Sequence, residues 1–135
     1  MTESSKDLAG AGSFGMKVHL HSRRGIHGED LADLVVRTIA RMGELVVERR
    51  GNLIGHIKAF LRVPDGTLQV NLVDPGLGPE KIDELPRETI VEADMKFMSA
   101  LVGLSDRDVE DLMEKSLEVL QEKMEVEVRE HHHEH

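Results

Sequence analysis

Apolar and polar residues alternate with a period of two along several parts of the chain. From Met16 to Ser22 the even positions are mostly apolar, while Lys17, His19 and His21 occupy the odd ones. This period is typical of a strand with one buried face, because successive side chains point to opposite sides of a sheet. By this pattern, strands are expected at 16–22, 45–48, 53–63, 68–72, 91–97 and 124–128.

Two other segments repeat their apolar residues at helical spacing. The first begins at Gly28, which is followed by acidic residues suited to a helix N-terminus, and is predicted to end at Gly43. The second begins at Ser105, with Asp108 three residues later as in a capping box, and runs to Leu120. Pro64-Asp65-Gly66 is a turn signal, and 74–87, rich in proline and glycine, is predicted to be a loop.

The predicted order is strand, helix, four strands, helix and strand. Two helices with one apolar stripe each cannot cover both faces of a sheet that is apolar on one face only. We therefore predict an α+β fold: a two-layer sandwich with a mixed or antiparallel sheet of five to six strands and two helices on one face. This arrangement is near ferredoxin-like, with an extra hairpin.

The length of 135 residues fits one domain. Residues 1–15 are polar and glycine-rich without periodicity, and we expect a disordered tail there. A single α+β domain is expected over 16–129, followed by a His-rich C-terminal tail over 130–135. The sequence leaves open whether that histidine run is native or a purification tag.

Charge and composition argue against several classes of protein function. The net charge of −9 and an aromatic content of 2% argue against nucleic-acid binding, which needs clustered cations and stacking rings. The chain has no cysteine, which excludes disulfides and thiolate metal sites. The longest uncharged apolar run, 97–104, is too short to cross a membrane, so a cytoplasmic protein is expected. Few amides and many charged residues give a thermophile-like composition.

The histidines of the first strand suggest a metal site. His19 and His21 are two residues apart and would project from the same face of a strand, opposite the core. His56, Glu92 and Asp94 have the same outward parity on their own strands. If these strands are neighbours, the five side chains form an imidazole–carboxylate cluster suited to zinc, nickel or cobalt. The alternative is that they are solvated polar residues on an exposed sheet.

Cations share that face. Lys17, Lys58 and Arg62 are candidates for holding an anionic ligand, although charged positions on a sheet often serve only solubility.

Short motifs in the second half of the chain carry a resemblance. Ile54-Gly55-His56-Ile57-Lys58, then Gly66, then Gly103-Leu104-Ser105 before a helix, resemble the small accessory module of metallochaperone GTPases of the cobalamin-biosynthesis type. The match covers residues 53–120. The resemblance implies a freestanding module related to metal delivery. Nucleotide hydrolysis is not implied, because the phosphate loop and the cysteine-rich metal motif of those GTPases are missing.

The leading hypothesis is a non-enzymatic binding or interaction module that handles a transition metal through its open sheet face. A second is a structural or regulatory homo-oligomer, or a partner of another protein, pairing through that face, where Ile54 and Phe60 project. A third is a small metal- or His-dependent enzyme. The chain shows no family-like spacing of a nucleophile and a base, and no catalytic residue is assigned.

Overall fold

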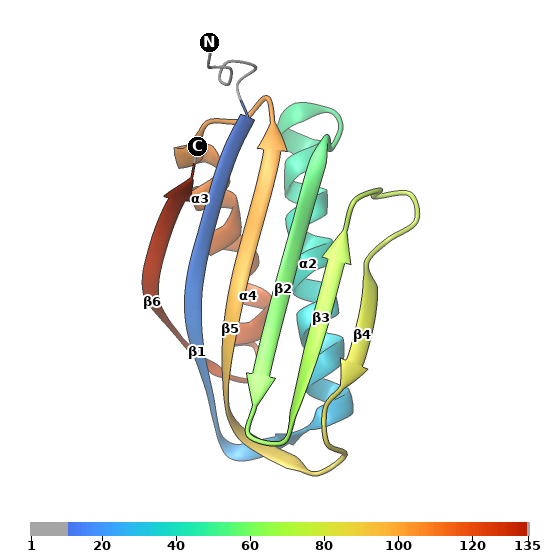
Figure 1. Cartoon of the computed structure of the whole chain (residues 1–135), viewed down its shortest axis with the longest axis vertical. Coiled ribbons are helices and arrows are strands. Elements are labelled where there is room, and N and C mark those ends of the chain that lie inside the picture. Colours follow the sequence, from blue (N-terminus) through green and yellow to red (C-terminus); the bar gives the residue numbers. More distant parts are fainter. Residues whose placement is uncertain (1–10, 135) are drawn as a thin grey trace.

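A six-stranded sheet with helices on one side makes up the fold (Figure 1). The computed structural model describes residues 11–134. The strand order is β4-β3-β2-β5-β1-β6, and all neighbouring strands are antiparallel. The elements are β1 (Ala11–His27), α2 (Gly28–Arg50), β2 (Gly55–Val63), β3 (Gly66–Leu72), β4 (Glu80–Glu84), β5 (Thr89–Val102), α3 (Asp106–Ser116), α4 (Glu118–Gln121) and β6 (Glu125–Glu134).

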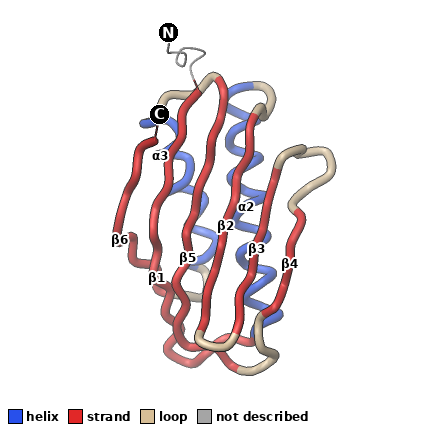
Figure 2. Tube along the Cα trace, viewed as in Figure 1, coloured by secondary structure: helices blue, strands red, loops and turns tan. Residues whose placement is uncertain are grey.

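The predicted α+β fold class is confirmed. Without the β3–β4 hairpin, the order β6-β1-β5-β2 and the connection βαββαβ are those of a ferredoxin-like fold. The hairpin extends the sheet beyond β2, and the chain returns through β5 to the centre. All helices lie behind the sheet in the view of Figure 2, so one face is covered and the other is open.

Alternation along the strands builds the core, as the sequence pattern predicts. Phe14, Met16, Val18 and Leu20 of β1 are all 2% exposed or less, and they face the helices. Outward-facing residues between them belong to the open face. The buried residues of α2, α3 and the strands form one hydrophobic cluster.

The first helix is longer than predicted. α2 continues through Gly43 to Arg50, so the predicted helix end at Gly43 and the strand at 45–48 are both wrong. Leu45 and Val46 are buried because they extend the helix's apolar stripe by another turn. Gly43 is instead a packing position, since an added Cβ would overlap the Leu72 side chain of β3.

Several strand limits also differ from the sequence pattern. β1 begins at Ala11, so residues 11–15, expected in a disordered tail, lie in the sheet; residues 1–10 of that tail are outside the described part. β4 forms within the predicted loop 74–87, as an edge strand paired only with β3. β6 continues to Glu134, so most of the expected C-terminal tail is paired with β1.

A register shift in β6 decides which way its last residues face. Val18 pairs with Val128, whereas Lys17 pairs with Glu130, so Arg129 is an extra residue between them. Because side chains alternate, one extra residue exchanges the two faces of the strand beyond it. Val126 and Val128 pack against the core before the shift, and after it His131, opposite Met16, lies on the helix side.

The second helical segment starts as predicted. The Ser105 Oγ accepts a hydrogen bond of 3.1 Å from the Asp108 N–H, which caps α3. The segment is interrupted at Leu117, after which the short α4 continues to Gln121.

Across the described residues, none of the helices has the length and apolar character needed to span a membrane.

Alanine substitutions at two glycines with positive φ test the backbone geometry at the end of α2 and the start of β2. Gly51 (φ 91°) ends α2 with open space around it, whereas at Gly55 (φ 129°) an added Cβ would overlap the carbonyl oxygen of Ala100. Gly51→Ala should cost about 1 kcal/mol of unfolding free energy from conformation alone. Gly55→Ala should cost about 3 kcal/mol or more, because backbone must also move. Urea unfolding of both variants measures the difference, and equal losses would contradict this account of β2.

Candidate functional site

The open face is the candidate site, because it contains most of the candidate binding residues that the sequence predicts. Its outward-facing residues come mainly from β1, β5 and β2 in the centre of the sheet, with β6 at the edge beside β1. They are Ser13, Gly15, Lys17, His19, His21, Glu92, Asp94, Lys96, Met98, Ala100, His56, Lys58, Phe60 and Arg62.

His19 lies between two carboxylates. Its Nδ1 is 2.9 Å from Asp94 Oδ1, directly opposite on β5, which is hydrogen-bond distance. Its Nε2 is 3.6 Å from Glu92 Oε1. The His19 side chain is 19% exposed, so it is the least solvated member of this group.

His21 shares the second carboxylate. Its Nδ1 is 3.8 Å from Glu92 Oε2, and the two residues are opposite each other in the register. On the other side of β1, the register places Glu127 opposite His19 and Glu125 opposite His21. Two imidazoles therefore lie between carboxylates from both neighbouring strands. We call His19, His21, Glu92 and Asp94 the histidine pair site.

His56 does not join this site. It is opposite Ala100 on β5, six residues from Asp94. At roughly 3.4 Å per residue this separation is about 20 Å along the strand. Parity alone placed all three histidines on one face correctly, but the strand register separates His56 from the other two. The same distance keeps His19 and His56 from acting together in one acid–base site.

The structure gathers the predicted cations and adds one. Lys17 is directly opposite Lys96, and the next strand places Phe60 opposite Lys96 and Arg62 opposite Asp94. The Arg62 guanidinium lies 5.7 Å from the centre of the Phe60 ring. Lys96 was missed in the sequence because only the register shows it facing Lys17.

Most of these cations lack an acidic partner. Lys17 is 3.6 Å from Glu130, but Lys58, Lys96 and Arg62 have no ion pair within residues 11–134. Like charges facing each other across strands destabilise a sheet. In a chain with 26 acids and 17 bases, this concentration of unpaired positive charge is unusual. We call Lys17, Lys58, Lys96 and Arg62 the cation patch.

Two depressions adjoin on the cation patch. One is lined by Phe60, Arg62 and Asp94, the other by Gly15, His56 and Met98, and Lys17 and Lys96 line both. The second exists because Gly15 has no side chain beside Met98.

The two residues expected to support self-association differ in placement. Phe60 is half-buried on the open face, and Ile54, which is 47% exposed, precedes β2. Pairing with a second copy stays a prediction.

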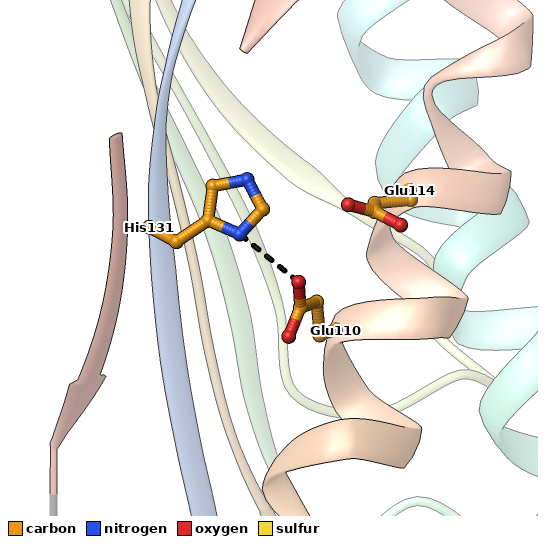
Figure 3. Close-up of side chains that lie close together, drawn as sticks. All are labelled: Glu110, Glu114 and His131. Carbon is orange, nitrogen blue, oxygen red and sulfur yellow. Dashed lines mark hydrogen bonds and ion pairs between the residues drawn. The ribbon is translucent and has the colours of Figure 1, made fainter. Parts of the chain in front are cut away.

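A different group has the most compact metal-ligand geometry in the described part of the chain. The group consists of Glu110 and Glu114 of α3 and His131 of β6 (Figure 3). Each residue offers one ligand atom, and these atoms all lie within 4.8 Å of one another. No three side chains of the histidine pair site meet that spacing. The sequence showed acids four residues apart on a helix, but it assigned His131 to a tail, so the group could not be found.

Comparison of the chain with known protein families, curated proteins and solved structures found no match.

The like-charge pair of Lys17 and Lys96 should lower the free energy of unfolding, and this effect can be measured. Lys96→Gln should stabilise the fold by about 0.5 kcal/mol at low ionic strength, because it removes a like-charge pair. Lys58→Gln is the control, since Lys58 is opposite Met98 and Asn71. Urea unfolding at low salt and in about 0.5 M salt measures both, and screening should abolish the gain. A gain that persists in salt would refute the electrostatic origin.

Proposed function

We propose that this chain is a non-enzymatic binding module that holds a divalent transition-metal ion at the histidine pair site. The observation that supports it is the arrangement around His19. In the neutral ring whose Nδ1–H donates to Asp94, Nε2 carries a lone pair, and Nε2 lies 3.6 Å from Oε1 of the Glu92 carboxylate.

Neither group can donate to the other in that state, so the contact is not a hydrogen bond. A cation placed between them satisfies both. Ligand atoms of a tetrahedral zinc ion lie about 3.3 Å apart, given metal–ligand bonds of about 2.0–2.1 Å. The distances from Glu92 Oε1 to His19 Nε2, 3.6 Å, and from Glu92 Oε2 to His21 Nδ1, 3.8 Å, are close to this value, so each ring lies beside a different oxygen of the carboxylate.

Asp94 then has a separate role. A carboxylate on the outer ring nitrogen of a metal-binding histidine fixes the ring's orientation and raises its basicity. His21 must turn toward the ion, which its 36% exposed side chain allows. The ligand set of imidazoles and carboxylates without thiolate suits zinc, nickel or cobalt. The resemblance to a metallochaperone accessory module supports the same class of function.

Calorimetric titration with zinc, nickel and cobalt tests the proposal on the full-length chain. His131, His132, His133 and His135 are replaced by Asn to remove binding at the C-terminus. We expect binding tighter than about 100 μM, or roughly −5.5 kcal/mol. His19→Asn should abolish it, and Asp94→Asn should weaken it by about tenfold.

His56→Asn is the matched control, because His56 lies on the same face but outside the site. Its affinity should equal that of the parent. Absence of binding by the parent, or equal losses in the His19 and His56 variants, would refute the proposal.

The cation patch favours a second function, binding of an anionic ligand. Its unpaired charges destabilise the free protein, and an anion in the adjoining depressions would relieve the repulsion between Lys17 and Lys96. The half-buried Phe60 ring offers an apolar surface beside these charges.

NMR titration with inorganic pyrophosphate tests this second function. Shifts should concentrate on Lys17, Lys96 and Arg62 and should fade as salt increases. Lys96→Gln should weaken binding about tenfold, since charge-assisted contacts contribute about 1.5 kcal/mol or more. Lys115→Gln on α3 is the control. Uniform shifts over all lysines would count against a site.

A further inference from the structure

We propose a second metal site, formed by Glu110, Glu114 and His131 at the junction of α3 and β6. It differs from the histidine pair site in its residues and lies on the helix side of the sheet. Both elements that form it belong to the folded core region, so the three side chains are positioned without a dedicated loop.

The helix supplies two carboxylates in line. Glu110 and Glu114 are four residues apart, so they project from the same side of α3, one turn from each other. Two like charges at this spacing repel. No cation within the described residues forms an ion pair with Glu114. A divalent ion between the two carboxylates would reverse that repulsion.

The strand supplies the imidazole. The extra residue Arg129 turns His131 to the helix side, opposite Met16 of β1. There the His131 ring meets the edge of Phe14 at right angles, with 5.5 Å between ring centres. Phe14 is 1% exposed, so the contact holds the ring against a rigid part of the core.

The three ligand atoms are already near bonding positions. His131 Nδ1 is 3.0 Å from Glu110 Oε2, and the Glu114 carboxylate points toward both in Figure 3. All the ligand atoms lie within 4.8 Å of one another. Small side-chain rotations are enough to bring them to the ligand–ligand spacing of a tetrahedral site, which is about 3.3 Å. His131 and Glu110 are 35% and 27% exposed, so solvent can supply the fourth ligand.

One imidazole and two carboxylates form a harder ligand set than the histidine pair site has. Zinc, cobalt and manganese suit such a set, and manganese tolerates the carboxylates well. Binding would fasten the last part of β6 to α3, two elements that the contact between His131 and Glu110 already joins. A bound ion would therefore stabilise the folded state by an amount that increases with the logarithm of its concentration above the dissociation constant.

The test uses the full-length chain with His132, His133 and His135 replaced by Asn, so that His131 is the histidine retained at the C-terminus. Zinc binding is measured by calorimetry, and manganese binding by the broadening of backbone amide signals. We expect a zinc site lost in His131→Asn and weakened at least about tenfold in Glu114→Gln. Manganese should broaden signals in α3 and at the end of β6.

Glu118→Gln is the matched control, because Glu118 is an exposed acid of the neighbouring α4. His19→Asn separates the two sites, since it removes the histidine pair site and should leave this one intact. Equal affinity in the Glu114 and Glu118 variants, or broadening confined to residues 132–135, would overturn the proposal. Because Glu114 has no structural partner in the described chain, its variant should fold even where His131→Asn loosens β6.

Discussion

Burial of one sheet face by helices is the constraint on which the rest of the molecule depends. It forces each strand to alternate, so that every second residue belongs to the core and the others are free to vary. With all 34 buried apolar residues of the described part of the chain in one cluster, the open face needs no contribution to the core. Polar and charged side chains can therefore occupy the open face at little cost in hydrophobic stabilisation.

The open face is divided by strand register into areas of different character. Histidines and carboxylates occupy the rows at one end of β1 and β5, and cations occupy the next rows. Such a division follows from cross-strand pairing, because residues far apart in the chain become direct neighbours. Lys17 and Lys96 are opposite each other in the register, although a neutral residue at either position would avoid the like-charge pair. Local violations of favourable pairing are most common where binding requires them.

Sequence reasoning predicted the elements that depend on local pattern and failed where distant contacts decide. The alternation in β1 and the Ser105 cap could be identified because each depends on residues within one segment. The predicted helix end at Gly43 is wrong, since the packing of Gly43 against Leu72 is invisible in the sequence. β4, with its charged residues, has weak strand character of its own and forms only because β3 offers an edge.

The same limit applies to the candidate sites. Parity showed correctly that His19 and His21 face the open side with Glu92 and Asp94, but the distance of His56 depends on register, which parity does not contain. His131 was placed in a tail because the sequence gives no sign of the extra residue that turns it toward α3.

That extra residue has a consequence for how this surface could change over generations. If the ladder closed up with all residues retained, so that Arg129 paired with Lys17, simple alternation would bring residue 130 under the helices and send the His131 ring outward. The last part of the strand would exchange its two faces at once, with the fold otherwise unaltered. A substitution that favours the regular register could thus move metal-binding capacity from one layer of the sandwich to the other, whereas deletion of Arg129 would leave His131 opposite Met16.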